Sequence, residues 1–329
     1  MKTILITGGA GFIGSHFVRY FLDKYPQYQI INIDLLTYAG NLKHLQGIEN
    51  HPQHHFIYGD IRNRSLIESL FQQYSIDAVI HFAAETHVDR SIQNPDIFVH
   101  TNIMGTQILL DTAKNTWQNA ENTRFHYIST DEVYGSLGET GFFSEESPLM
   151  PNSPYSASKA AAEMLVRAYT QTFGLNTVIS RSSNNYGIDQ HDEKLIPTII
   201  RHALQEKPIP IYGNGNHIRD WLYVSDHCRA IDAVFHRGKS GEAYNIGGHC
   251  EYTNRQIAQT ICRLLDEKKP RPSGKYADLI TSVTDRAGHD FRYALNTQKI
   301  ENQLSWQPET DFVAGLNQTV DWYIPYFLE

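Results

Sequence analysis

The chain of 329 residues is long enough for one large α/β domain, or for a core domain with a smaller lobe. Its composition, 41% hydrophobic and 19% charged, is that of an ordinary globular protein and excludes a disordered or fibrous chain. The formal net charge of −8 and the absence of a Lys/Arg block exclude a nucleic-acid-binding surface. A small anionic ligand stays open, because a few placed cations are enough to meet its charge.

The cysteines and the N-terminus indicate where the protein resides. Cys228, Cys250 and Cys262 cannot all pair and have no CxxC spacing, which favours a reducing compartment. Glycines interrupt the apolar run after Ile6, so no secretory signal is expected, and no segment approaches the roughly 18 apolar residues of a membrane span. We expect a cytoplasmic protein without membrane contact.

Short apolar runs alternate with amphipathic segments of helical length in the first half of the chain. Strands are expected over 3–7, 29–33, 55–58, 78–82, 125–129 and 177–180, and helices near 12–24, 65–74, 96–115 and 155–173. This alternation predicts a parallel sheet covered on both faces, and right-handed crossovers then give the doubly wound Rossmann type of α/β fold.

The rhythm changes after about residue 183. Loops rich in Gly, Asn, Asp and Pro are expected over 209–215, 238–242, 247–252 and 268–275, with helices over 195–204, 226–236, 254–266 and near the C-terminus. We expect residues 1–183 to form the dinucleotide-binding domain with the catalytic residues. Residues 184–329 are expected to form mainly a smaller substrate-binding lobe, although the chain can cross between the two.

A glycine-rich segment, GGAGFIG at 8–14, joins the first strand to the first helix. Glycines allow the tight turn and the close approach of backbone N–H groups to a pyrophosphate, which the helix N-terminus then faces. Asp34 ends the second strand twenty residues after Gly14. A carboxylate there accepts from the ribose hydroxyls and repels a 2′-phosphate, so the sequence predicts NAD rather than NADP.

A tyrosine and a lysine begin a later helix. Tyr155 and Lys159 are four residues apart, so both lie on one helical face. A neighbouring ammonium favours the phenolate and is expected to lower the pKa of the tyrosine toward the range of a base. Two acids, Asp131 and Glu132, follow Thr130 at the end of the fifth strand and add proton chemistry to hydride chemistry.

Together these motifs resemble the short-chain dehydrogenase/reductase superfamily, in its extended branch that acts on nucleotide sugars. The segment STDEVYG at 129–135 closely resembles that of the dTDP-glucose 4,6-dehydratase family, and the resemblance covers nearly the whole chain. Further matches are DLLTYAGN at 34–41, AAETHVDRS at 83–91, RSSNNYG at 181–187, IRDWLYV at 218–224 and DRAGHD at 285–290. The sequence departs from the family pattern at Thr86, Ile188 and Ala287, which bears on loop stiffness and base preference rather than on the reaction.

The resemblance implies three groups of site residues. The catalytic group is Thr130, Asp131, Glu132, Tyr155 and Lys159. The group that binds the cofactor NAD is Gly8, Gly11, Phe12, Ile13, Gly14, Asp34, Leu35, Leu36, Thr37, Asp60, Ile61, Phe82, Ala83, Ala84, Glu85, Thr101, Tyr155, Lys159 and Asn185. The group that binds the nucleotide-sugar substrate is Thr86, Thr130, Asn184, Lys194, Leu195, Pro210, Ile211, Tyr212, Arg219, Asn254, Asp285, Arg286 and His289.

The implied reaction is NAD-dependent conversion of dTDP-glucose to dTDP-4-keto-6-deoxyglucose, by C4 oxidation, loss of water across C5 and C6, and hydride return to C6. Tyr155 is expected as the C4 base, Glu132 as the C5 base and Asp131 as the acid that protonates the leaving hydroxyl. Lys194, Arg219 and Arg286 also make physical sense as cations for a diphosphate inside an acidic protein. No metal site is expected, and the resemblance implies a homodimer through helices near 96–115 and 155–173.

Two alternatives remain at this point. A nucleotide-sugar 4-epimerase or decarboxylase would use the same cofactor and the same Tyr/Lys pair, but it would not need the two adjacent acids. A non-catalytic NAD(H)-binding regulatory protein would not need Tyr155, Lys159, Asp131 and Glu132 together.

Overall fold

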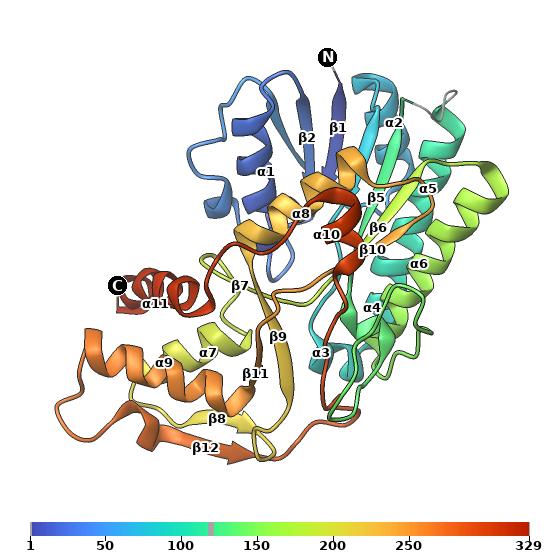
Figure 1. Cartoon of the computed structure of the whole chain (residues 1–329). Helices are drawn as coiled ribbons and strands as arrows, with labels where there is room; N and C mark the ends of the chain where they lie inside the picture. The colour runs from blue at the N-terminus through green and yellow to red at the C-terminus, as the bar shows by residue number, and fades with distance from the viewer. Residues whose placement is uncertain (1, 118–121, 329) are drawn as a thin grey trace.

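A computed structural model describes residues 2–117 and 122–328. Its centre is a seven-stranded sheet in the order β10-β6-β5-β4-β1-β2-β3, and every neighbouring pair is parallel (Figure 1). The strands are β1 (Thr3–Thr7), β2 (Gln29–Asp34), β3 (His54–Tyr58), β4 (Ala78–His81), β5 (Arg124–Thr130), β6 (Thr177–Ser182) and β10 (Ala243–Ile246). The predicted doubly wound Rossmann fold is confirmed.

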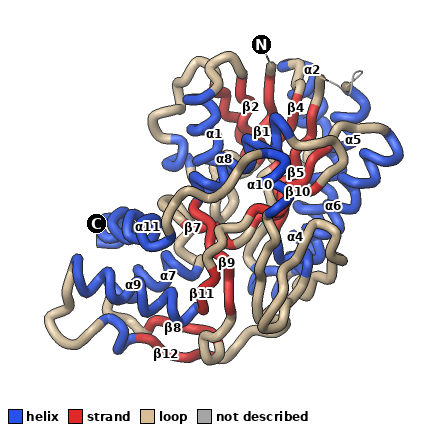
Figure 2. The backbone as a smooth tube through the Cα atoms, in the orientation of Figure 1, coloured by secondary structure: helices blue, strands red, loops and turns tan. Residues whose placement is uncertain are grey.

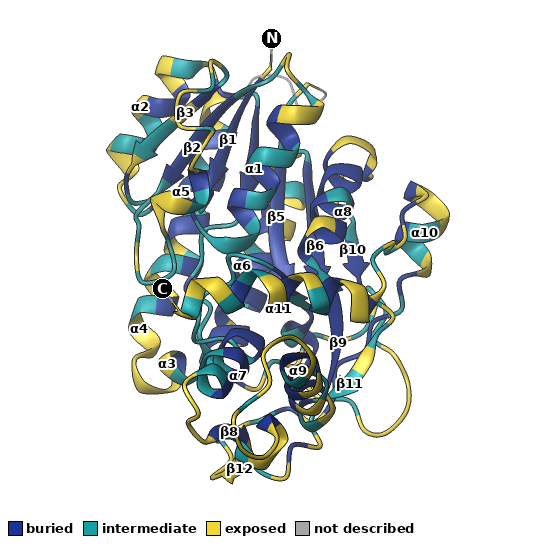
Figure 3. Cartoon of the chain, turned by 90° about the vertical axis from the view of Figure 1, so that its left-hand side faces the viewer, coloured by how far each residue is buried: buried dark blue, intermediate teal, exposed yellow. Residues whose placement is uncertain are grey.

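Helices cover both faces of this sheet, so its strands are buried from both sides (Figure 3). Alternate residues of β1 serve the two faces: Leu5 packs with helices α2 (Arg64–Tyr74), α5 (Gly105–Thr116) and α6 (Pro154–Phe173). Its neighbours Ile4 and Ile6 pack instead with α1 (Phe12–Lys24) and α8 (Val224–Arg237). The two-residue period of a strand therefore divides one apolar run between two cores.

A smaller lobe lies beside the carboxyl ends of the central strands (Figure 2). It contains the three-stranded sheet of β7 (Asn184–Tyr186), β9 (Ile218–Tyr223) and β11 (Glu251–Thr253), and the pair of β8 (Ile209–Tyr212) and β12 (Ile280–Val283). Helices α7 (Leu195–Leu204), α9 (Asn254–Lys268) and α11 (Phe312–Leu328) share its separate apolar core. The short helix α10 (Gln298–Leu304) instead packs against β10 and α8 of the larger unit.

The chain crosses between the two units more than once. After β9 it returns to the central sheet as α8 and β10, and then re-enters the lobe at β11. Residues far beyond 183 therefore complete the Rossmann sheet. The division expected at residue 183 does not separate the two units in space.

Three expected elements are wrong in detail. The loop expected over 247–252 ends in strand β11. The single helix expected over 96–115 is divided into α4 (Pro95–Phe98), the π-helical turn η2 (Val99–Met104) and α5, preceded by α3 (Val88–Gln93). The loop expected over 209–215 begins with strand β8, because Ile209 and Ile211 are buried in the lobe core and Pro210 between them pairs in register with Thr281 of β12. Short 3₁₀ turns η1 (Leu42–Leu45), η3 (Asp131–Tyr134) and η4 (Tyr276–Leu279) complete the chain.

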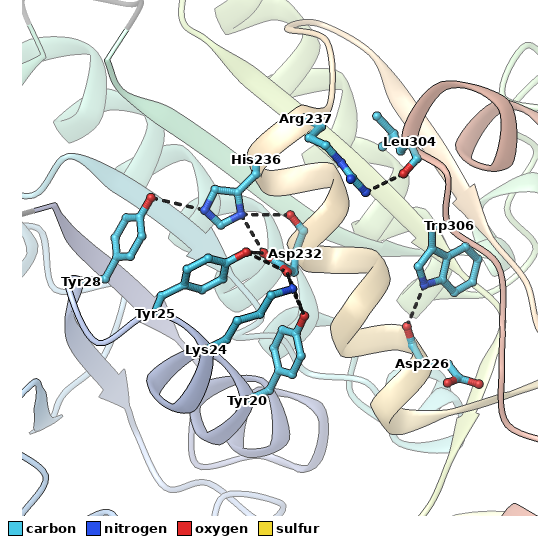
Figure 4. Close-up of polar contacts among 10 residues, drawn as sticks. All are labelled: Tyr20, Lys24, Tyr25, Tyr28, Asp226, Asp232, His236, Arg237, Leu304 and Trp306. Atoms are coloured by element: carbon cyan, nitrogen blue, oxygen red, sulfur yellow. Dashed lines mark hydrogen bonds and ion pairs between the residues drawn. The ribbon is translucent and has the colours of Figure 1, made fainter.

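A polar network joins the C-terminal part of α1 to α8 (Figure 4). The Asp232 carboxylate accepts from the Tyr20 hydroxyl at 2.8 Å, the Lys24 ammonium at 2.7 Å and the Tyr25 hydroxyl at 3.0 Å. The Nδ1 atom of His236 lies 2.7 Å from the same carboxylate. This network fixes the far end of the helix whose first turn belongs to the predicted phosphate loop. Among the described residues, no helix is long and apolar enough to cross a membrane.

Candidate active site

A cleft of about 340 Å³ lies at the carboxyl edge of the central sheet. This is where ligands bind in open α/β sheets, because loops from neighbouring strands diverge there. The glycine-rich loop, the end of β2, the end of β4 and the start of α6 all line the cleft. Residues of the later half, including Asn184, Asn185 and Lys194, close it from the other side.

The glycine-rich loop packs too closely for side chains. Gly8 has a φ of +75°, and a Cβ atom on it would lie 2.6 Å from the backbone nitrogen of Ala83. A Cβ atom on Gly14 would lie 2.2 Å from the Gly8 carbonyl oxygen. Both glycines are therefore required where helix α1 begins, and its first-turn N–H groups face the cleft as an anion site.

Asp34 couples the end of β2 to that loop. Its carboxylate accepts from the backbone N–H of Ala10 at 2.9 Å and from that of Leu36 at 2.8 Å. Burial raises the pKa of Asp34, while the two backbone donors oppose the shift. The residue thus stands beside the phosphate loop, as expected for an acid that binds the ribose of a dinucleotide. Leu36 itself has a φ of 52° and is absent from the cleft lining.

Tyr155 and Lys159 lie side by side in the first turns of α6, and both are nearly fully buried. The Lys159 ammonium donates to the backbone carbonyl of Ile128 at 2.7 Å, and burial lowers the pKa of Lys159 to about 7. Burial, together with the charge of Glu132, raises the pKa of Tyr155 well above its usual value, although the Thr130 hydroxyl opposes the shift. The expectation of a lowered tyrosine pKa is therefore wrong, because the cost of burying a phenolate dominates.

The two acids after β5 have different surroundings. Asp131 is 1% exposed, one of its carboxylate oxygens has no hydrogen-bond partner among the described residues, and burial with the adjacent Glu132 raises its pKa well above the usual value. Burial also raises the pKa of Glu132, but Arg286, Arg219 and Lys194 act against that shift. Both pKa values are raised, but three cations oppose the shift at Glu132, whereas the charge of Glu132 adds to the shift at Asp131. Unequal surroundings of two neighbouring carboxyls are the arrangement that separates an acid from a base.

The three predicted cations converge on Glu132. Arg219 is 5% exposed and is oriented by backbone carbonyls, donating to that of Asp290 at 2.9 Å. The Arg286 guanidinium lies 3.6 Å from the Asp89 carboxylate, and the Lys194 ammonium donates to the Thr86 carbonyl at 3.4 Å. Three cations therefore gather where the sequence predicts a diphosphate, with Glu132, Asp89 and Glu193 beside them.

A stacked histidine pair stands next to these cations. The ring centroids of His217 and His289 are 3.6 Å apart, and the Asp285 carboxylate lies 2.6 Å from His289 Nδ1 and 3.3 Å from His217 Nε2. Burial and Arg286 lower the pKa of His289 to about 4. His217, Asp285 and His289 lie close enough together to hold a metal ion. Their geometry argues against one, because parallel stacked rings cannot both direct a nitrogen lone pair at a single ion. The neighbouring arginines also repel a cation.

The structure brings most predicted site residues together. Every predicted catalytic residue, and every predicted cofactor-binding residue except Leu36, lines the cleft. Of the predicted substrate residues, Thr86, Thr130, Asn184 and Lys194 line it, whereas Leu195, Pro210, Ile211, Tyr212, Arg219, Asn254, Asp285, Arg286 and His289 lie outside its lining. Sequence reasoning missed Gln190 and His191, which line the cleft and carry no motif signal, and Ser183, which lies inside a quoted motif.

Comparisons with known proteins agree with this geometry. Residues 5–319 match the family described as GDP-mannose 4,6 dehydratase. A dTDP-glucose 4,6-dehydratase of Haemophilus influenzae is 52% identical over 98% of this chain and 98% of its own length. The solved dTDP-glucose 4,6-dehydratase of Bacillus anthracis in complex with NAD is 46% identical, with a TM-score of 0.87 over 98% of this chain and 96% of that one. The Streptomyces venezuelae enzyme with NAD and TYD bound is 45% identical, with a TM-score of 0.90 over the same shares.

A Rossmann sheet, a glycine-rich loop, a buried Tyr/Lys pair and a smaller second lobe define an extended short-chain dehydrogenase/reductase. Within that superfamily, the family of this chain follows from the relatives that match nearly its whole length, and the adjacent acids agree with it. The chain belongs to the dTDP-glucose 4,6-dehydratase family.

Proposed function

We propose that this chain is an NAD-dependent hydro-lyase that converts dTDP-glucose to dTDP-4-keto-6-deoxyglucose, with the residue roles given below. The observation that carries the proposal is the pair Asp131–Glu132 in the same cleft as Tyr155 and Lys159. An epimerase or a decarboxylase does not need the two adjacent acids. A regulatory NAD(H)-binding protein needs neither the acids nor the Tyr/Lys pair.

The cleft fits NAD. Gly8, Gly11 and Gly14 line the cleft at the first turn of α1, where the pyrophosphate would bind, and Asp34 stands where the ribose hydroxyls would bind. When bound, NAD accepts the hydride from C4 of the sugar and returns it to C6. Asp60, Ile61 and Phe82 would line the adenine side, and Tyr155, Lys159 and Asn185 the nicotinamide side.

Two groups on α6 begin the reaction. Tyr155 as the phenolate takes the proton of the C4 hydroxyl while the C4 hydride would pass to NAD, and the loss of both makes C4 a ketone and the C5 proton acidic. In this proposal the Lys159 ammonium stabilises the phenolate. The Thr130 hydroxyl acts in the same direction, because it opposes the rise in the pKa of Tyr155 that burial causes. Their burial excludes water from the oxidation step.

The two acids complete the elimination. Glu132, whose negative charge is favoured by Lys194, Arg219 and Arg286, removes the C5 proton. Asp131, whose burial favours the protonated carboxyl, donates a proton to the C6 hydroxyl, which leaves as water. Glu132, whose proton exchanges with solvent, then returns a proton to C5. Asp131 regains from solvent the proton that it donated, and Tyr155 releases the proton that it took, so all three groups regain their starting states within one turnover.

The substrate lies between the cleft and the lobe in this proposal. Lys194, Arg219 and Arg286 meet the two phosphates, since guanidinium groups bind phosphate oxygens in pairs. Tyr212, Asn254 and the Asp285–His289 segment would hold the nucleoside farther out. The two family descriptions share the 4,6-dehydration and differ in the nucleotide sugar, and identities near 50% favour dTDP-glucose.

We infer a homodimer from the outer face of α6. Ala157, Met164 and Ala168 are exposed on it, with Met164 48% exposed, and Ala161 and Leu165 lie half-buried between them. The adjacent turn η2 adds Val99 and Met104, each nearly half exposed. Apolar side chains gathered on neighbouring helices are typical of an interface. The three unpaired cysteines fit a reducing cytoplasm.

A panel of nucleotide hexoses tests the function. Purified enzyme is incubated with the dTDP, UDP and GDP forms of glucose and with GDP-mannose, and keto-sugar formation is scored by mass spectrometry and NMR. We expect loss of one water and a C6 methyl group with dTDP-glucose as the preferred substrate. A C4 epimer without water loss would contradict the proposal.

A further inference from the structure

A fully buried tyrosine lies against the catalytic lysine. The Lys159 ammonium nitrogen is 4.2 Å from the ring centroid of Tyr127, which is only 1% exposed. Tyr127 is on β5, three residues before Thr130, and Lys159 is on α6, so the contact joins the sheet to the catalytic helix. The distance is well within the range of a cation–π interaction.

No acid in the described part of the chain forms an ion pair with Lys159, although the charge of Glu163 acts to raise the pKa of Lys159. Its one hydrogen bond among the described residues goes to the Ile128 carbonyl. The nearest acid on its own helix, Glu163, is bound by the Arg181 guanidinium at 2.6 and 3.0 Å. The other groups near Lys159 are Tyr155 on α6 and His81 on β4, and burial with the Lys159 charge lowers the pKa of His81 to about 3, so that its ring is neutral.

The lysine therefore sits where burial favours loss of its proton, near neutral pH. A neutral amine would no longer stabilise a phenolate at Tyr155. An aromatic face attracts a charged ammonium but not a neutral amine. The ring therefore favours the protonated lysine and raises its pKa, whereas burial lowers it. The low-polarity surroundings strengthen this attraction, because no water screens it.

We propose that Tyr127 is a positioning residue whose ring face keeps Lys159 charged and directed at Tyr155. The ring, rather than its hydroxyl, carries this role, since the hydroxyl makes no well-formed hydrogen bond in the described part of the chain. The inference rests on the proposed function, in which the Lys159 ammonium supports the Tyr155 phenolate.

Three replacements at residue 127 separate the ring face from packing. Tyr127→Phe keeps the face and removes the hydroxyl. Tyr127→pentafluorophenylalanine keeps the shape and reverses the charge of the face. Tyr127→Leu removes the face, and the fluorinated variant decides the matter if the leucine variant does not fold.

Two measurements are made on each full-length variant. The proton affinity of Lys159 is titrated by competitive acetylation with acetic anhydride and peptide mass spectrometry, before NAD is added. The pH profile of keto-sugar formation is then recorded for the NAD-loaded enzyme. We expect the fluorinated and leucine variants to lower the pKa of Lys159 by about one pH unit. The alkaline limb of the activity profile should move to lower pH by a similar amount.

Tyr127→Phe is expected to keep the wild-type pKa of Lys159 and the wild-type pH profile of activity. If the fluorinated variant titrates like the phenylalanine variant, the ring only fills space and the inference is wrong. If the wild-type enzyme forms no keto sugar, the proposed function fails, while the acetylation titration still tests the role of Tyr127.

Discussion

The Asn102 side chain pairs with both backbone groups of Glu85: its Oδ1 accepts from the Glu85 N–H at 2.9 Å and its Nδ2 donates to the Glu85 carbonyl at 3.0 Å. The same Nδ2 donates to the Ser158 hydroxyl at 2.8 Å. Asn102 lies in the π-helical turn η2, so this buried amide ties the loop after β4 and the catalytic helix to one irregular turn. Such turns occur often at functional sites because they redirect a side chain.

Asn102→Ala is expected to lower the free energy of unfolding by about 3 kcal/mol, because it leaves buried backbone groups without partners. Chemical denaturation of the NAD-free chain measures the change. Gln107→Ala on the next helix is the control, since its partner Asp111 is only half-buried and a change under about 1 kcal/mol is expected. Equal losses in the two variants would contradict the assigned role of the amide.

Changes at Asp34 test the cofactor assignment. We expect the wild-type chain to bind NADP at least tenfold more weakly than NAD, or about 1.4 kcal/mol, because the carboxylate repels a 2′-phosphate. Asp34→Asn should narrow the gap, as measured by calorimetric titration with both cofactors. Equal affinities in the wild-type chain would overturn the assignment of Asp34.

Glu132→Gln and Tyr155→Phe should fail at different steps. The glutamine keeps the shape of the acid but cannot remove the C5 proton, so turnover should fall by about 10² to 10⁴-fold after C4 has been oxidised. Rapid mixing with dTDP-glucose should then show reduced nicotinamide accumulating on the enzyme. Tyr155→Phe should give little of that signal, because the first proton is never removed. A glutamine variant with normal turnover would refute the role of Glu132.

The Asp232 network provides a test of pH-dependent stability. Burial would raise the pKa of Asp232, but hydrogen bonds from His236, Lys24 and Tyr20 lower it from 3.8 to about 2. A carboxyl with a depressed folded-state pKa contributes stability above its unfolded value and loses it as pH falls through the folded value. Asp232→Asn should therefore cost about 2 kcal/mol near neutral pH.

The difference between wild type and Asp232→Asn should shrink between about pH 4 and pH 2. Urea denaturation across this range measures it. Asp23→Asn on α1 is the control, because Asp23 is exposed and lies outside the network. A difference that is independent of pH would show that the side-chain shape of Asp232 matters rather than its charge.

The sequence predicts the parts of this molecule that follow from local patterns. The strand Thr3–Thr7 and the helix Phe12–Lys24 are found with the predicted bounds, because apolar periodicity and the glycine turn act on the same few residues. The π-helical turn carries no periodic signal, and it is held by contacts of Asn102 with residues far away in the sequence. The raised pKa of Tyr155 likewise depends on tertiary burial, which the four-residue spacing to Lys159 does not report.

The path of hydrogen through one turnover tests all the proposed roles together. Substrate deuterated at C4 should give product deuterated at C6, while the C5 hydrogen should come from solvent, since Glu132 removes it as a proton. In D₂O the product should therefore carry solvent deuterium at C5, and no net reduced cofactor should appear during steady turnover. An epimerase would return the label to C4, and a plain dehydrogenase would leave it on released cofactor. NMR of the product distinguishes the three outcomes, and either of the last two would refute the dehydratase roles of Asp131 and Glu132 without affecting the fold or the cofactor site.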